Sequence, residues 1–286
     1  MFELYVTNEK NQTLNLNDQV NYAVVDADGM GSLSAGVSIE PLVASDTSKI
    51  NSAYVKYRPI NLSILPRRNI EMMRRQLYQF FSVKHSVNLH YRSYQRDLRI
   101  SGVVESCEPT LFEKPQTMHV SIICEDPYWK DAYTFINDIS YLIKLFEFPF
   151  SIEEPVEFEQ INTEMVQTVV NTGDFETGVV IKIKALNTVV NPEVYSIDER
   201  KTIRLLFTMR AGDMITIDTR TGKKSITLLR DGTAQNIINT MQRELNSLKN
   251  YWFVLSAGEN RFAYFADEGN EFMEITIEHS NLYQGV

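Results

Sequence analysis

Cysteine is scarce in this sequence, because Cys107 and Cys124 are the only two among 286 residues. Two cysteines are too few for the disulfide framework that stabilises small secreted domains. We therefore expect both thiols to be reduced in a protein made in the cytosol.

Long apolar runs are also absent. The segment Tyr141-Leu142-Ile143 is ended by Lys144, and no stretch approaches the ~18 apolar residues that a membrane span requires. The first residues, Met1 to Tyr5, lack the charged and apolar regions of a signal peptide. We expect a soluble protein with no membrane span that is made without export.

Catalytic motifs are missing as well. The sequence has no Gly-Lys-Ser/Thr phosphate loop, no Gly-x-Ser-x-Gly turn and no His-x-x-x-His pair. One alternative is a metal site, because His90, His119 and Cys124 fall on expected strands of one domain. A second alternative is a wall-degrading hydrolase, with candidate carboxylates at Glu153, Glu154, Glu157 and Glu159. A dense acidic run beside prolines is more often a solvated linker, so we predict no catalytic, cofactor-binding or metal-binding residues and no cofactor.

Positive charge is in short supply in the second half. Residues 1–145 carry 15 Lys+Arg against 16 Asp+Glu, whereas residues 146–286 carry 13 against 21, within a net charge of −9. Nucleic-acid phosphates need many Lys and Arg contacts. The composition therefore argues against a stable complex with nucleic acid.

Alternation of apolar and polar residues is the dominant pattern, and it indicates strands with one buried face. The apolar rows are Phe2/Leu4/Val6, Ile60/Leu62/Ile64, Met118/Val120/Ile122/Cys124, Val179/Ile181/Ile183 and Met273/Ile275/Ile277. A hairpin is predicted from 213 to 229, because Gly222 supplies the positive φ that its short loop needs. The inward residues of that hairpin are Ile215, Ile217, Ile226 and Leu228.

Helical spacing of apolar residues occurs twice, from Pro66 to Phe81 and from Thr233 to Lys249. Between the two helices, Pro149 and Pro155 interrupt any regular element. These patterns predict a mainly β protein with a few helices (α+β), built from two β-sandwiches that each carry one helix. The predicted domains are 1–145 and 146–286.

The most unusual segment is basic. Between Lys56 and Arg99 there are ten Lys+Arg against two acids, Glu71 and Asp97, with four tyrosines interleaved and Tyr54 just before them. Arg and Tyr are enriched in subunit interfaces, but they also stack on nucleic-acid bases, and a solvated basic face is a third alternative. We favour a subunit interface, and its predicted residues are Arg58, Arg67, Arg68, Arg74, Arg75, Arg92 and Arg96.

The order of several short motifs resembles that of one protein family, the phage distal tail proteins. The motifs are Ser121-Ile122-Ile123-Cys124-Glu125-Asp126-Pro127-Tyr128-Trp129, a preceding Pro-Arg-Arg helix ending at Phe80-Phe81, Asn171-Thr172-Gly173-Asp174, Asn191-Pro192, the hairpin after Gly212, Gly258-Glu259-Asn260 and the terminal Tyr283-Gln284-Gly285-Val286. The resemblance covers nearly the whole chain, although residues 28–56 match no part of the family pattern.

This resemblance implies a first domain like the tail-tube fold that forms a homo-hexameric ring, and a galectin-like second domain. It further implies a structural, non-enzymatic baseplate component of the virion, made in the bacterial cytoplasm. The implied partners are the tail-tube protein, the tail-associated hub protein and receptor-binding or fibre proteins, with DNA only passing through the channel. The alternative is a carbohydrate-binding module that contacts host wall sugars, with Tyr251, Trp252 and Tyr264 as candidate stacking residues.

Overall fold

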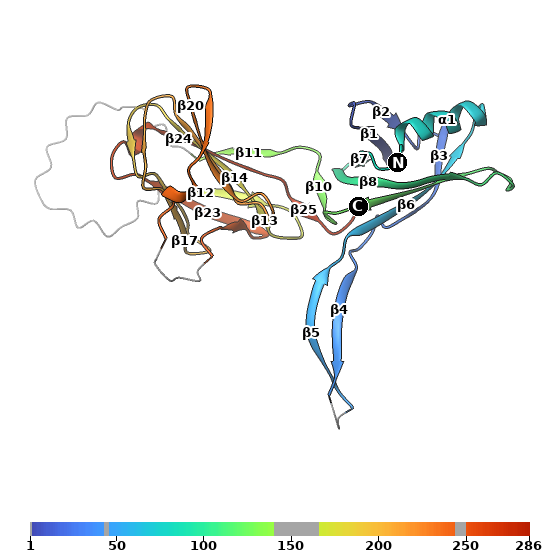
Figure 1. The fold of residues 1–286 in the computed structure, drawn as a ribbon, viewed down its shortest axis with the longest axis horizontal. Coiled ribbons are helices and arrows are strands. Elements are labelled where there is room, and N and C mark those ends of the chain that lie inside the picture. The colour runs from blue at the N-terminus through green and yellow to red at the C-terminus, as the bar shows by residue number, and fades with distance from the viewer. Residues whose placement is uncertain (1, 43–45, 140–165, 244–249) are drawn as a thin grey trace, which may run out of the picture. The chain divides into compact units, whose positions relative to one another are not determined.

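The computed structural model describes residues 2–42, 46–139, 166–243 and 250–286 (Figure 1). The chain divides into two units, which we describe separately. Unit 1 comprises Met1–Ala132 together with Leu282–Val286, and unit 2 comprises Tyr133–Asn281.

This division differs from the boundary expected near residue 145. The segment 140–155 lies outside the described residues, and the first unit already ends at Ala132. The last five residues of the chain return to unit 1, because Trp129 and Lys130 pair with Tyr283 and Leu282. Trp129 is fully buried and Tyr283 is 7% exposed, so this pairing closes the apolar core of unit 1.

Unit 1 contains a nine-stranded sheet in which seven strands follow the order β2-β1-β7-β8-β9-β6-β3, while β10 pairs with β8 and with β25. Its strands are β1 (Glu3–Asn8), β2 (Thr13–Asn15), β3 (Tyr22–Asp28), β6 (Arg58–Pro66), β7 (Ser86–Arg92), β8 (Asp97–Pro109), β9 (Met118–Cys124), β10 (Trp129–Asp131) and β25 (Leu282–Tyr283). The predicted apolar rows of β6 and β9 are buried throughout. In the first row Leu4 and Val6 are buried but Phe2 is 43% exposed, because it precedes the first residue of β1.

One helix, α1 (Ile70–Phe80), packs on this sheet through Met73 and Leu77. It begins later than predicted, because Pro66 ends β6 and pairs there with Tyr22. Asn69 has a left-handed backbone, and its side chain accepts a hydrogen bond from the amide of Met72, which caps the helix.

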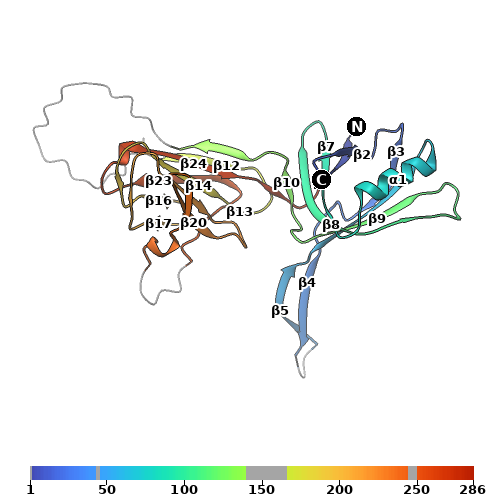
Figure 2. The ribbon, with the colours of Figure 1, turned by 45° about the horizontal axis from the view of Figure 1, so that its top comes forward.

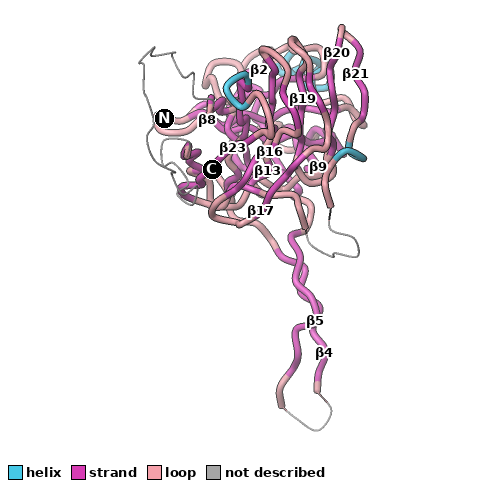
Figure 3. The backbone as a smooth tube through the Cα atoms, turned by 90° about the vertical axis from the view of Figure 1, so that its left-hand side faces the viewer, coloured by secondary structure: helices cyan, strands magenta, loops and turns pink. Residues whose placement is uncertain are grey.

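A two-stranded hairpin leaves the sheet of unit 1 (Figures 1, 2 and 3). It consists of β4 (Ala35–Pro41) and β5 (Ser48–Val55), which pair only with each other among the described strands. Every residue of the two strands except Gly36 is exposed. We call residues 35–55 the arm; the sequence pattern did not predict it.

Unit 2 is a β-sandwich, because side chains from its two main sheets share one core. The first sheet has the order β11-β24-β14-β19-β20-β21 and the second has the order β12-β23-β16-β17. The strands of the first are β11 (Phe135–Asp138), β24 (Met273–His279), β14 (Val180–Ala185), β19 (Met214–Asp218), β20 (Ser225–Arg230) and β21 (Thr233–Asn236). Those of the second are β12 (Gln167–Asn171), β23 (Gly258–Phe265), β16 (Glu193–Ser196) and β17 (Lys201–Arg204). Two smaller pairs are β13 (Thr177–Gly178) with β22 (Val254–Leu255) and β15 (Val189–Val190) with β18 (Thr208–Met209).

The predicted hairpin of unit 2 is confirmed. Its strands β19 and β20 place Ile215 opposite Leu228 and Ile217 opposite Ile226, and all four side chains are buried. Gly222 has a φ of 76° in the turn. On the solvent side of the same sheet, Lys182 and Lys184 form ion pairs across the strands, with Glu278 and Glu274.

The second predicted helix, Thr233 to Lys249, is wrong over its described part. Asp231 and Gly232 both have positive φ and turn the chain back, so that Thr233–Asn236 pairs with β20 as a strand. A short 3-10 helix, η2 (Ile238–Thr240), follows, and another, η3 (Asn270–Phe272), precedes β24. Ile237 and Met241, which are four positions apart as residues on one face of a helix would be, are both buried in the core.

The architecture confirms the predicted class, a mainly β protein with few helices. Only α1 is an α-helix in the parts of the chain that the structure describes. No helix in those parts is long and apolar enough to cross a membrane.

Candidate interaction surfaces

Four of the seven predicted interface arginines lie on or directly before α1. Arg67 and Arg68 precede the helix, and Arg74 and Arg75 lie on it.

 Arg67, Arg68 and Arg75 are exposed, and Arg74 is half-buried. The guanidinium of Arg67 donates a hydrogen bond to the side-chain oxygen of Gln19 at 3.0 Å.

The outward side of α1 combines these guanidinium groups with apolar side chains. Ile70, Met72 and Tyr78 are 44%, 54% and 42% exposed. A shallow hollow of about 450 Å³ lies on this side, lined by Asn69, Glu71, Met72, Arg74, Arg75 and Tyr78. Exposed apolar and aromatic groups beside arginine are the composition found in protein interfaces.

Arg92 and Arg96 lie elsewhere in unit 1, at the turn between β7 and β8. Arg92 forms an ion pair with Asp97 at 2.9 Å, and its guanidinium lies 5.3 Å from the ring centroid of Tyr5. The guanidinium of Arg96 lies 5.1 Å from the ring centroid of Tyr283. Arg92 and Arg96 thus both contact other residues of unit 1. These contacts differ from those of the arginines near α1.

Arg58 differs from the other six because its side chain is buried, with 4% exposure. Its guanidinium donates to four backbone carbonyls, with distances of 2.5–2.7 Å; the acceptors are Gly29, Gly31, Pro127 and Gln284. Burial lowers the pKa of this guanidinium from its ordinary value. Arg58 therefore joins the segment between β3 and β4, the turn before β10 and the C-terminal residues, and its polar groups face inward.

The metal alternative does not fit the strand geometry. His119 and Cys124 lie on opposite faces of β9, because residues an odd number of positions apart point in opposite directions. His119 is within 3.0 Å of the Ser63 hydroxyl, and His90 stacks on Tyr5. Burial raises the pKa of the Cys124 thiol to about 12, so this side chain behaves as a core residue. No group of three potential metal ligands occurs within the described ranges. The acidic residues 153–159 lie outside them.

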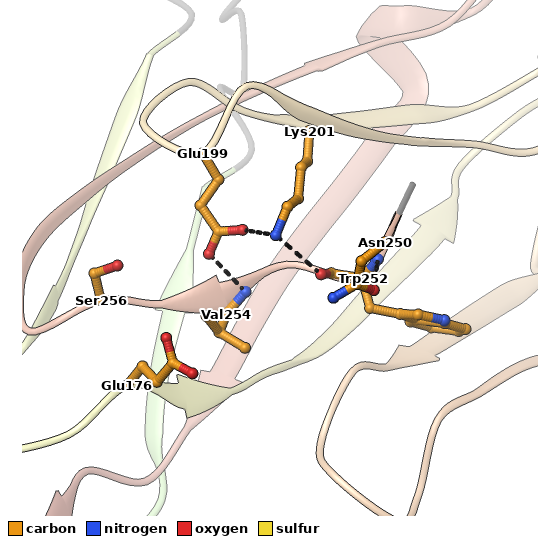
Figure 4. Close-up of a pocket in the computed structure, with 7 residues that line it drawn as sticks. All are labelled: Glu176, Glu199, Lys201, Asn250, Trp252, Val254 and Ser256. Carbon is orange, nitrogen blue, oxygen red and sulfur yellow. Dashed lines mark hydrogen bonds and ion pairs between the residues drawn. The ribbon is translucent and has the colours of Figure 1, made fainter. Parts of the chain in front are cut away.

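A shallow polar pocket of about 350 Å³ lies in unit 2 (Figure 4). Glu199 forms an ion pair with Lys201 at 2.5 Å, and its other carboxylate oxygen accepts from the Val254 amide at 3.0 Å. These polar groups therefore satisfy one another. The indole of Trp252 points away from Glu199 and Lys201 and packs against the core of the sandwich.

The candidate sugar-stacking residues are not gathered on an open surface. Tyr264 is 4% exposed, and Tyr251 and Trp252 are only partly exposed and pack against the core. The pocket thus offers little aromatic surface to a ligand, and its Glu199 and Lys201 pair with each other.

The arm and the returning C-terminus were missed by the sequence reasoning. A signal for the arm was present, because Val37 and Ile39 alternate with polar residues before a turn-rich segment, as strands of a hairpin do. No local pattern indicates that Leu282–Val286 belongs with the first unit, because that contact joins residues more than 150 positions apart.

The comparisons with known proteins point to one group. Residues 172–283 match the family model described as "Siphovirus-type tail component, C-terminal domain". No curated protein sequence matches the chain significantly.

Solved structures are similar over almost the whole length. The crystal structure of the SPP1 Dit protein, titled a paradigm of the hub adsorption apparatus in phages that infect Gram-positive hosts, has a TM-score of 0.68 and 12% identity, with 98% of each chain covered. A chain of the phage P2 baseplate in its activated conformation with Ca has a TM-score of 0.54 and 10% identity, with 100% of each chain covered. A chain of the same baseplate with Sr has a TM-score of 0.52 and 9% identity, covering 97% of this chain and 98% of that one.

Proposed function

We propose that this protein is a structural adaptor of a phage tail tip, because residues 172–283 match the siphovirus-type tail component model and the whole chain has a fold similar to that of SPP1 Dit. In this proposal unit 1 assembles into a homo-hexameric ring, and unit 2 holds receptor-binding or fibre proteins. The ring joins the tail-tube protein to the tail-associated hub protein. The protein is a virion component, made in the bacterial cytoplasm, and is not an enzyme.

The observation that carries the proposal is the agreement of both units with one kind of protein. The family model covers the sandwich of unit 2, whereas the fold similarity to SPP1 Dit extends over 98% of the chain. The polar pocket of unit 2 supports a non-catalytic role, because its Glu199 and Lys201 neutralise each other.

Passage of DNA through the ring is compatible with the charge of the chain. A net charge of −9 gives phosphates few counter-charges to bind. DNA would then pass the channel without being held there.

The oligomeric state tests this proposal. We expect the purified full-length chain to form a hexamer, with a mass six times 33.0 kDa by native mass spectrometry and light scattering. Ring-shaped particles with a central hole should be visible by electron microscopy. A chain that stays monomeric at all concentrations up to the highest attainable would contradict the proposed ring.

The carbohydrate-binding alternative has less support. Its candidate residue Tyr264 is buried, and the indole of Trp252 packs on the core beside a pocket whose charged groups pair with each other. We therefore propose the ring adaptor alone.

A further inference from the structure

One guanidinium group joins the two ends of the arm. Arg58 follows Val55, the last residue of β5, by three positions, and it donates hydrogen bonds to the carbonyls of Gly29 and Gly31 at 2.6 and 2.7 Å. Gly31 precedes Ala35, the first residue of β4, by four positions. The Arg58 side chain therefore connects the segment that leads into the arm with the segment that leaves it.

The same guanidinium binds both segments through which the chain is connected to unit 2. Its other acceptors are the carbonyls of Pro127, at 2.6 Å, and Gln284, at 2.5 Å. Pro127 precedes β10, after which the chain passes into unit 2, and Gln284 follows β25, with which the chain returns. Because β10 and β25 are hydrogen-bonded to each other, both connections reach Arg58 through one strand pair.

Backbone contacts hold the residues after β25 against the loop 29–31. The amide of Val286 donates a hydrogen bond to the carbonyl of Met30 at 3.2 Å. Gly285 lies so close to Gly31 that a Cβ atom added to Gly285 would be 2.6 Å from the carbonyl oxygen of Gly31. The C-terminal residues thus lie close to the point where the arm leaves the sheet (Figure 1).

The loop 29–31 has little room to move away from this contact. A Cβ atom added to Gly29 would be 2.0 Å from the carbonyl oxygen of Pro59, so the loop is packed against the start of β6. Met30 is 8% exposed and belongs to the apolar core of unit 1. A displacement of the residues after β25 therefore has to move this loop or break its hydrogen bonds.

The chemistry of the guanidinium makes its four hydrogen bonds depend on one another. Its N–H groups are fixed in one plane, so a shift of one carbonyl turns the group and changes the other three bonds. Arg58 is 4% exposed, so water has little access to replace a lost acceptor. All four acceptors belong to the backbone, and the guanidinium therefore links segments of the chain rather than side chains.

We propose that residues 284–286 brace the base of the arm through Arg58 and the loop 29–31, so that a displacement of β25 loosens the arm. The arm depends on its base, because β4 and β5 pair only with each other among the described strands. The brace lies within one chain and does not require the ring. If unit 2 holds a partner, which rests on the proposed function, a partner that displaces β25 would change the arm.

Two glycine variants test the brace by hydrogen exchange of the full-length chain. The amide of Lys56 reports on the base of the arm, because it donates to the carbonyl of Ser34 at 3.2 Å. Gly285→Ala places a methyl group against the loop, and we expect the Lys56 amide to exchange about 10-fold faster, since exchange follows local opening. Gly31→Ala is the matched control, because a Cβ atom at Gly31 meets nothing within 4 Å. We expect that control to exchange like the wild type.

The outcomes separate this inference from the proposed function. All variants are compared at a concentration at which light scattering gives one oligomeric state. Unchanged exchange of the Lys56 amide in Gly285→Ala overturns the brace and leaves the ring adaptor standing. Equally fast exchange in Gly31→Ala also overturns it, because the close contact of Gly285 would then have no special role. A wild-type chain that never forms rings overturns the proposed function and leaves the brace standing.

A double-mutant cycle tests the part of Arg58. Tyr283→Ala disturbs β25 itself, and we expect it to raise the exchange rate of the Lys56 amide about 5-fold when Arg58 is present. Arg58→Lys keeps the charge but loses the planar group that reaches four carbonyls. In the Arg58→Lys background we therefore expect Tyr283→Ala to have almost no further effect on this amide.

Leu89→Ala is the control for a general loss of stability, because Leu89 is buried in the same core on β7. We expect this variant to leave the exchange of the Lys56 amide close to that of the wild type. An equal increase for Leu89→Ala and Tyr283→Ala would overturn the inference. The same effect of Tyr283→Ala with and without Arg58 would overturn the path through the guanidinium.

Discussion

At the scale of single residues, Arg58 shows what composition cannot reveal. The sequence groups it with six other arginines of a basic segment, but its guanidinium is buried and bound to four carbonyls from three separate segments. Hydrogen bonds between a charged group and buried carbonyls are stronger than neutral ones. The partners come from residues 29 to 284, so no local pattern could have identified them.

Replacing Arg58 should destabilise unit 1. We expect Arg58→Met to lower the free energy of unfolding by about 3 kcal/mol, because four carbonyls lose their donor in a buried place. Urea unfolding followed by the fluorescence of Trp129, in a Trp252→Phe background, would measure this for unit 1 alone. Arg68→Met is the matched control, because Arg68 is exposed, and equal unfolding midpoints for the two variants would contradict the assigned role.

At the scale of elements, period-two patterns predicted strands well, since the alternation of side chains is a property of the strand itself. The apolar rows of β6, β9, β14 and β24 are buried as expected. Helix limits were predicted less well. Pro66 is as compatible with the end of a strand as with the first turn of a helix, and the turn at Asp231-Gly232 directs the next residues into a strand.

The start of α1 gives a prediction at this scale. Asn69 has a φ of 38° and caps the helix through its side chain. Asn69→Ala should lower the free energy of unfolding by about 1 kcal/mol, because the cap is lost and alanine disfavours positive φ. Asn69→Gly should cost only a few tenths of a kcal/mol, since glycine tolerates this backbone. Chemical denaturation of both variants measures the difference, and a larger loss for Gly than for Ala would contradict it.

At the scale of the whole molecule, the sequence gives the order of the motifs but not the path of the chain. The resemblance to distal tail proteins is in agreement with the family match of residues 172–283 and with the fold of the whole chain. The division into units could not be predicted, because it depends on the pairing of β10 with β25. The predicted interface arginines fall into two groups on the surface of unit 1 and one buried residue, Arg58, and their part in assembly stays a prediction.

Removing Leu282–Val286 should therefore lower the stability of unit 1 against unfolding, although these residues follow unit 2 in sequence. The truncation removes the pairing with β10, the buried Tyr283 ring and the Gln284 carbonyl that Arg58 binds. We expect the unfolding transition reported by Trp129 to move to lower urea concentration, while that reported by Trp252 is unchanged. Tyr283→Phe is the control, because it loses only the hydroxyl contact to Asp131 at 3.3 Å. An unchanged Trp129 transition in the truncated chain would contradict this division.

The return of the C-terminus makes unit 2 an insertion within unit 1. The chain leaves after β10 and re-enters at β25, and these two strands are hydrogen-bonded neighbours. An insert whose two ends are anchored next to each other can be enlarged, trimmed or exchanged without stretching its host. Evolution could thus replace the inserted unit of such a protein as a cassette while the core of unit 1 stays intact.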